Sequence, residues 1–196
     1  MKCNLYSCSP CILSKLALLF ALIAIYFIGS CGISNGPSTL NPSSREQDGV
    51  EQGERERGTQ IGQMAPDFEL EKVGGGKVSL SDLRGKPAVL VFWTAWCPSC
   101  KEEAKHVNKL ATEFEPKGVN IVGINIGEGD ARISQGIKEF GIRYTVLKDK
   151  DTSVARRYKV IGTPTVVFLD RRGIVRYFGN ELPKNYAEIL DEALKN

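Results

Sequence analysis

Apolar and polar positions follow two different periods from residue 61 to the end of the chain. Residues 88–93 are a continuous apolar run, which is typical of a strand buried on both faces of a sheet, and residues 119–126 predict a second buried strand. Between them, apolar side chains recur every three or four positions over residues 98–114, and this spacing predicts an amphipathic helix. A strand, helix, strand order of this kind predicts an α/β fold with a central parallel pair.

The same periods continue to the C-terminus and predict a second group of elements. These are a helix over 132–140, a short strand over 145–147, a helical turn capped by Asp151, strands over 165–169 and 174–178, and a helix over 185–194. The turn residues 171–173 between the last two strands predict a hairpin. We therefore expect an α/β sandwich that ends in a hairpin and a helix.

The first 30 residues have the order of a secretory signal. Basic Lys2 and Lys15 precede an apolar run over 16–28, and small residues follow it before Cys31. This ending resembles the lipobox of bacterial lipoproteins, which implies lipid attachment at Cys31. The alternative is an uncleaved membrane anchor, because the uncharged stretch is close to the minimum spanning length. Both readings place the rest of the chain outside the cytoplasm, tethered to a membrane.

Composition divides residues 31–196 into two parts. Residues 31–60 are rich in Pro, Ser, Gly and charged residues with few large apolar side chains, which predicts a disordered linker. Residues 61–196 then form the single predicted domain. The formal net charge of +3 is too small to indicate a nucleic-acid partner.

Only two of the six cysteines, Cys97 and Cys100, lie in the predicted domain. They stand where a strand ends and a helix begins, with Pro98 at the first helical position and Cys97 as the N-cap. Unpaired backbone N–H groups and the helix dipole favour a thiolate there, so the pKa of Cys97 is expected to be lowered. We expect Cys97 to be the exposed nucleophile and the more deeply buried Cys100 to resolve the mixed disulfide.

Other uses of the cysteine pair need residues that the sequence lacks. A zinc site needs two more ligands, and the domain offers no further cysteine and one histidine, His106, which we interpret as a surface residue. Covalent haem attachment would need a histidine where Lys101 stands. We therefore predict no cofactor or metal beyond the redox-active disulfide itself.

Four sequence blocks, in order, resemble one protein family. They are Ala-Pro-Asp-Phe-Glu-Leu at 65–70, Leu-Ser-Asp-Leu-Arg-Gly-Lys-Pro at 80–87, Phe-Trp-Thr-Ala-Trp-Cys-Pro-Ser-Cys at 92–100 and Gly-Thr-Pro-Thr at 162–165. Together they resemble the thioredoxin superfamily, in particular the membrane-tethered TlpA/ResA-type oxidoreductases. The resemblance implies a thioredoxin-like three-layer sandwich with a central mixed sheet and a central insertion over 127–145.

The resemblance also implies roles for individual residues. Cys97 corresponds to the attacking cysteine, Cys100 to the resolving one, and Pro164, after Thr163, to a cis-proline that faces them. Glu103 stands where ResA-like proteins carry an acidic residue that exchanges protons with the second cysteine; the alternative is a solvated surface charge. Trp96, Pro98 and Ser99 would form the rim of the active site. Val91 replaces the buried aspartate of thioredoxin, so the proton acceptor must lie elsewhere.

The function implied is that of an extracytoplasmic thiol-disulfide oxidoreductase at a bacterial cell membrane. It would reduce a disulfide in an exported protein, with apocytochrome c as a candidate, and would receive electrons from a membrane thiol-disulfide carrier. Two alternatives stay open. One is a peroxiredoxin-like peroxidase, although Leu90 stands where those proteins carry a proline. The other is a non-enzymatic lipoprotein that uses this fold to bind partners.

Overall fold

The computed structural model describes residues 56–195, and the elements it contains follow a mixed α/β order. They are β1 (Glu69–Lys72), β2 (Lys77–Ser79), α1 (Leu80–Leu83), β3 (Ala88–Trp93), α2 (Pro98–Phe114), β4 (Asn120–Ile126), α3 (Asp130–Phe140), β5 (Thr145–Asp149), α4 (Ser153–Arg157), β6 (Thr165–Leu169), β7 (Val175–Gly179) and α5 (Tyr186–Lys195). The predicted signal, the lipid-attachment residue Cys31 and most of the predicted linker lie outside the described residues.

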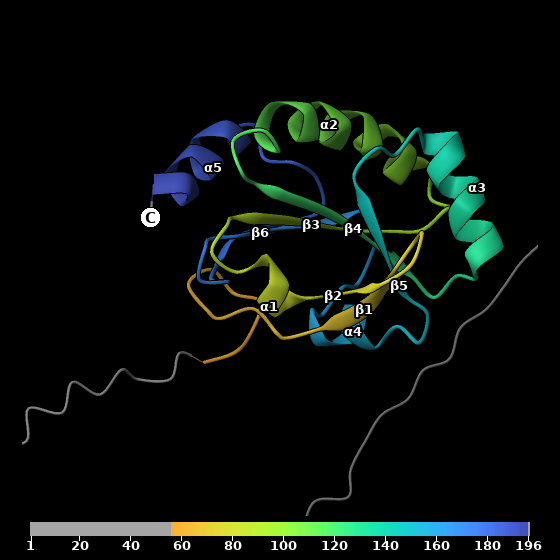
Figure 1. The fold of residues 1–196 in the computed structure, drawn as a ribbon, viewed down its shortest axis with the longest axis horizontal. Helices are drawn as coiled ribbons and strands as arrows, with labels where there is room; N and C mark the ends of the chain where they lie inside the picture. The colour runs from red at the N-terminus through yellow and green to blue at the C-terminus, as the bar shows by residue number, and fades with distance from the viewer. Residues whose placement is uncertain (1–55, 196) are drawn as a thin grey trace, which may run out of the picture. The chain divides into compact units, whose positions relative to one another are not determined.

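One seven-stranded sheet, in the order β2-β1-β5-β4-β3-β6-β7, forms the middle layer. The pairs β3–β4 and β4–β5 are parallel, and the others are antiparallel, so the sheet is mixed as expected. Helices α2, α3 and α5 cover one face, and α1 and α4 lie on the other (Figure 1). Each face has its own apolar cluster, because successive residues of a strand point to opposite sides.

Strand β3 is buried along its whole length and β4 is buried between its two end residues, as their sequences predict. Every residue of β3 is buried, and Trp93 packs its ring on Phe140 of α3. The apolar side of α2 lies on this face of the sheet, where Val107, Leu110 and Phe114 are inaccessible to solvent. Burial of side chains of this size contributes about 1.5–3 kcal/mol each, so these contacts hold α2 against the sheet.

Three elements at the start of the domain were not predicted. Strands β1 and β2 and helix α1 are three or four residues long, too short to show a period in the sequence. Ser79 forms a capping box with Asp82 at the start of α1. Arg57 and Gly58, at the end of the predicted linker, lie against the domain: Arg57 pairs with Asp67, and Gly58 donates a hydrogen bond to the Met64 carbonyl.

The predicted cap of the turn at residue 151 is only partly right. The N-cap of α4 is Thr152, and Asp151 accepts a hydrogen bond from Ser153 N–H. The carboxylate of Asp149 accepts from both Val154 and Ala155 N–H groups. Asp149 reaches them because it ends β5 and is fully buried, a tertiary position that the sequence pattern does not reveal.

No helix among residues 56–195 is long and apolar enough to cross a membrane.

Candidate active site

Cys97 lies at the N-terminus of α2, where the sequence places it. It is the N-cap, Pro98 follows in the first turn, and the Cys97 sulfur accepts a hydrogen bond from Cys100 N–H at 3.2 Å. Strand β3 is paired with β4 on one side and β6 on the other, and its last residue, Trp93, is four residues before Cys97. The sheet therefore fixes the place where α2 starts. The helix therefore presents unpaired N–H groups to the Cys97 sulfur.

Two further groups contact the Cys97 sulfur. The Ser99 hydroxyl lies 3.2 Å away, and the thiol donates to the Thr163 carbonyl, also at 3.2 Å. Burial by itself raises the pKa of Cys97, but hydrogen bonds from Cys100 and Ser99, followed by one from the Thr163 side chain, outweigh it, and the pKa is lowered. The expected direction is thus found, but the expected exposure is wrong: Cys97 is 4% exposed, because these neighbours cover it.

Cys100 differs from Cys97 although it lies only three residues further along α2. Burial is the main cause that raises its pKa to about 12, followed by the hydrogen bond with Cys97. The two thiols are not bonded to each other. This arrangement makes a thiolate easier to form at Cys97 than at Cys100, which is the division of roles that disulfide exchange needs.

Pro164 lies next to the cysteines because of the sheet register. Strand β6 pairs antiparallel with β3, and Phe92 faces Thr165, so the residues just before β6 lie beside those just after β3. The Thr163–Pro164 peptide bond is cis. The Thr94 and Thr163 hydroxyls are 3.4 Å apart, which joins the two loops directly.

Glu103 is buried, not a solvated surface charge. It is 7% exposed, and its Oε1 accepts a hydrogen bond from Leu182 N–H at 2.8 Å. His106 Nδ1 lies 3.6 Å from Oε2, and the His106 side chain is exposed, as predicted. Glu103 lies one helical turn from Cys100, so both project from the same side of α2.

Exposed apolar side chains flank the cysteine. Trp96, directly before Cys97, is 66% exposed, and Ile161, three residues before Pro164, is 98% exposed. Pro98 and Ser99 are exposed beside them. Exposed apolar groups that gather around a reactive residue favour contact with another molecule. The predicted rim of Trp96, Pro98 and Ser99 is thus accessible, and Ile161 adds to it.

Sequence reasoning missed three residues near the cysteines. Ile161 is one, and its signal was an isolated apolar residue in a loop before Gly162. Tyr144 is another: it is buried, and burial, followed by the charges of Cys100 and Glu103, raises its pKa. Glu128 is the third, and its carboxylate accepts a hydrogen bond from Ala95 N–H. The available signal was that Glu128 follows β4, which is parallel to β3, so both strands end at the same edge of the sheet.

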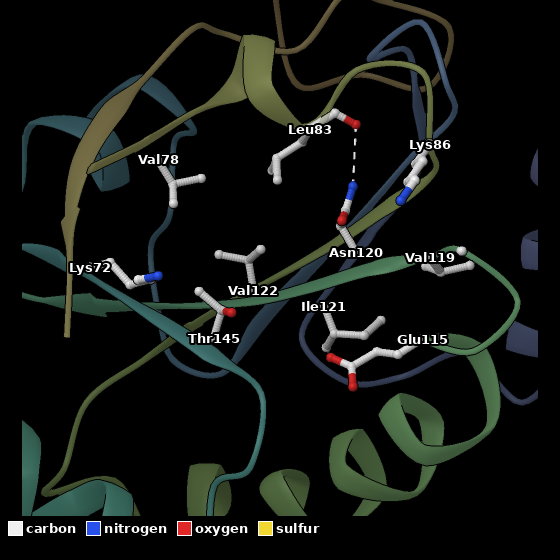
Figure 2. Close-up of a pocket in the computed structure, with 11 residues that line it drawn as sticks. Lys72, Val78, Leu83, Lys86, Glu115, Val119, Asn120, Ile121, Val122 and Thr145 are labelled. Carbon is white, nitrogen blue, oxygen red and sulfur yellow. Dashed lines mark hydrogen bonds between the residues drawn. The ribbon is translucent and has the colours of Figure 1, made fainter. Parts of the chain in front are cut away.

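A surface pocket lies away from this chemistry (Figure 2). Its volume is about 320 Å³, and it surrounds the start of β4, where Asn120 donates a hydrogen bond to the Leu83 carbonyl. Because Asn120 pairs with Ala88, the pocket lies at the opposite end of β3 from Trp93 and the cysteines. Lys72 and Lys86 lie at its edge. None of the predicted site residues lines it.

The arrangement supports two-electron exchange between thiols and a disulfide. Cys97 can attack a disulfide sulfur as a thiolate, and Cys100 lies within one helical turn to displace the bound product. Among residues 56–195, no group of three His, Cys, Asp or Glu side chains is placed to hold a metal ion.

Comparison with known proteins gives consistent similarities. Residues 61–178 match the model of the AhpC/TSA family. The chain is 32% identical over 142 residues to the thiol-disulfide oxidoreductase ResA of Bacillus thuringiensis subsp. konkukian, covering 72% of this chain and 80% of that protein. It is 36% identical over 114 residues to ResA of Bacillus subtilis, covering 58% and 64%.

Solved structures give the same result. A candidate thiol:disulfide interchange protein DsbE from Chlorobium tepidum superposes with a TM-score of 0.64 and 28% identity, covering 69% of this chain and 98% of that one. A candidate protein disulfide isomerase from Bacteroides thetaiotaomicron gives a TM-score of 0.65 and 27% identity, covering 70% and 92%.

Proposed function

We propose, because the chain belongs to the AhpC/TSA family of the thioredoxin superfamily and is a thiol-disulfide oxidoreductase, that it works as a reductase of disulfides in exported proteins. One observation carries the proposal: Cys97 has a lowered pKa while Cys100, one turn away, has a raised one. Thiol-disulfide exchange needs this division, because the first sulfur must attack as a thiolate while the second waits as a thiol.

The reaction transfers two electrons in two steps. The Cys97 thiolate attacks one sulfur of the substrate disulfide, forms a mixed disulfide and releases the first substrate thiolate. Cys100 then loses its proton and attacks the Cys97 sulfur, which releases the second substrate thiolate. The substrate is reduced to two thiols, and Cys97 and Cys100 are left as a disulfide. We infer that a membrane thiol-disulfide carrier reduces this disulfide again.

Glu103 is proposed to receive the proton that Cys100 loses. Its burial on the same side of α2, one turn from Cys100, supports this role, and the hydrogen bond from Leu182 N–H holds its carboxylate in place. His106, 3.6 Å away and exposed, connects the carboxylate to solvent. A carboxylate held in this way can act as a general base.

The substrate and the cellular place are part of the same proposal. The exposed Trp96 and Ile161 suit an apolar segment of a protein better than a small polar disulfide. We propose an exported protein as the substrate, with apocytochrome c as one candidate. The N-terminal residues would tether the enzyme outside the cytoplasm at a bacterial cell membrane, through lipid on Cys31 or through an uncleaved anchor.

The reduction potential of the Cys97–Cys100 pair tests the direction of the reaction. It is measured by Trp96 and Trp93 fluorescence in buffers of defined thiol-disulfide ratio. A potential near roughly −270 mV, that of thioredoxin, is expected for a reductase. A potential near roughly −120 mV would make the protein an oxidant and refute the proposal. Consumption of hydrogen peroxide at a rate above that of disulfide reduction would instead favour the peroxidase.

A further inference from the structure

The loop that connects β3 to Cys97 is held by a carboxylate from another part of the chain. Glu128, between β4 and α3, accepts a hydrogen bond at its Oε2 from Ala95 N–H at 2.8 Å. Ala95 is buried and lies two residues before Cys97. The paired register of β3 ends at Trp93, so Ala95 lies beyond the sheet and depends on a side chain as its partner.

The carboxylate is itself fixed in place. Asn125, which is fully buried at the end of β4, donates from Nδ2 to the same Glu128 Oε2 at 2.7 Å. Arg132 Nε of α3 lies 3.7 Å from Oε1, and the Glu128 side chain is 10% exposed. Two donors share Oε2 and the side chain has little exposure, so the Glu128 carboxylate has little room to move and this anchor is a rigid one.

Helix α3 also approaches Ala95, from a second direction. Gly136 faces Ala95 so closely that a Cβ at position 136 would come within 2.6 Å of the Ala95 Cβ. It would also come within 2.8 Å of the Trp93 ring. Ala95 is therefore restrained at its N–H by Glu128 and at its Cβ by Gly136, two independent contacts from the segment that contains α3.

We propose that Glu128 is a positioning residue for the thiol-disulfide reaction: it fixes the 94–96 loop, and through it the place of the Cys97 sulfur against its hydrogen-bond donors. Those donors lie 3.2 Å from the sulfur, within hydrogen-bond distance, and a hydrogen bond weakens when its donor moves away or loses alignment. The Cys97 N–H also donates to the Thr94 carbonyl at 3.3 Å, so movement of the loop is passed on to Cys97.

Two conservative variants of Glu128 distinguish the effect of its hydrogen bond to Ala95 from the effect of its charge. Glu128→Gln keeps an oxygen at the same reach and loses the charge. Glu128→Asp keeps the charge and is shorter by one methylene, about 1.5 Å. The measurement is the rate of alkylation of reduced Cys97 by iodoacetamide as a function of pH, in the full-length chain, with Cys97 followed by peptide mass spectrometry. Glu139→Asp, on the exposed side of α3, is the matched control.

Positioning predicts that Glu128→Asp slows alkylation at pH 7 by roughly tenfold and moves the midpoint of its pH profile upward. Glu128→Gln and Glu139→Asp should behave as the unchanged chain. Hydrogen exchange of the Ala95 amide provides a second reading, with faster exchange in Glu128→Asp alone. Amides in α5 serve as the reference for this measurement: unchanged protection there shows that faster exchange at Ala95 is a local effect and not a loss of overall stability.

Two results would overturn the proposal. If Glu128→Gln alters the pH profile and Glu128→Asp does not, Glu128 acts through its charge. If neither changes Cys97 reactivity while both lower the thermal midpoint, the residue is structural only. The inference rests on the thiol-disulfide chemistry proposed above, but alkylation needs no disulfide substrate. A failure of Glu128 to position Cys97 is therefore distinguishable from a failure of the proposed reductase function.

Discussion

At the scale of single residues, two identical side chains acquire opposite properties within one turn of a helix. Cys97 is the N-cap and collects hydrogen bonds from Cys100 N–H and the Ser99 hydroxyl, which stabilise its thiolate. Cys100 is inside the helix and faces the apolar cluster below α2, where burial disfavours its charge. Neighbouring donors decide the pKa of the first sulfur, and burial decides that of the second.

Removal of the Ser99 hydroxyl is expected to make Cys97 less reactive. The pKa of Cys97 is lowered partly by this hydroxyl, so Ser99→Ala should move the midpoint of the alkylation profile upward, toward the ordinary thiol value of 9.0. A hydrogen bond worth about 1 kcal/mol corresponds to a rate roughly fivefold slower at pH 7. Ser99→Thr, which keeps the hydroxyl, is the control. An unchanged profile in Ser99→Ala would show that the helix N–H groups suffice.

At the scale of elements, helix α3 is a structural part of the active site although it carries neither cysteine. Its residues Ile133 and Phe140 are buried against the sheet, and Gly136 lets its backbone approach Ala95. The predicted start at 132 is two residues late, because Gly129 is the N-cap and Asp130 begins the helix. The segment between β4 and β5 thus supports the loop that presents Cys97.

Gly136→Ala tests this contact. Alanine favours a helix over glycine by about 1 kcal/mol, so an exposed position would gain stability. Here the new Cβ meets Ala95 and Trp93, and we expect a net loss of about 1–3 kcal/mol in the free energy of unfolding, measured by urea denaturation. Ser134→Ala, at an exposed position of α3, should be neutral or stabilising. A stabilised Gly136→Ala variant would mean that α3 shifts freely away from the loop.

At the scale of the whole domain, the active site is assembled from segments that are distant in the sequence. The β3–α2 junction supplies Trp96 and Cys97, and the loop before β6 supplies Ile161, Thr163 and Pro164. The antiparallel β3–β6 pair brings the two together. Exposed Trp96 and Ile161 belong to these two segments, while the pocket beside Asn120 lies at the other end of the central strands (Figure 2).

Ile161→Ser is expected to separate protein substrates from small ones. Loss of an apolar contact should lower kcat/KM for a protein disulfide, for example insulin, by roughly tenfold, since burying such a side chain contributes about 1.5–3 kcal/mol. Reduction of a small aromatic disulfide, which does not reach position 161, should change less than twofold by the same reasoning. Ile61→Ser removes another exposed isoleucine and is the control. Equal losses for both substrates would place Ile161 outside a docking surface.

Local sequence patterns were enough to predict the reactive cysteine pair and most of the framework. The spacing of Cys97 and Cys100 and the position of Pro98 are local, and a helix N-cap needs only neighbouring residues to form. The buried strands β3, β4 and β6 and the helices α2, α3 and α5 have apolar periods long enough to identify them. The short β1, β2 and α1 do not.

Which side chains are buried and which distant groups meet depends on the folded arrangement of the chain. Cys97 is covered by Thr163, which is 66 residues away in the sequence. Glu103 accepts a hydrogen bond from Leu182, which is 79 residues away in the sequence. Glu128 reaches Ala95 across 33 residues. Each contact exists because the strands pair in one register and the helices pack on one face of the sheet. Periodicity shows that a residue belongs to a strand or helix, but not which partner the fold places opposite it.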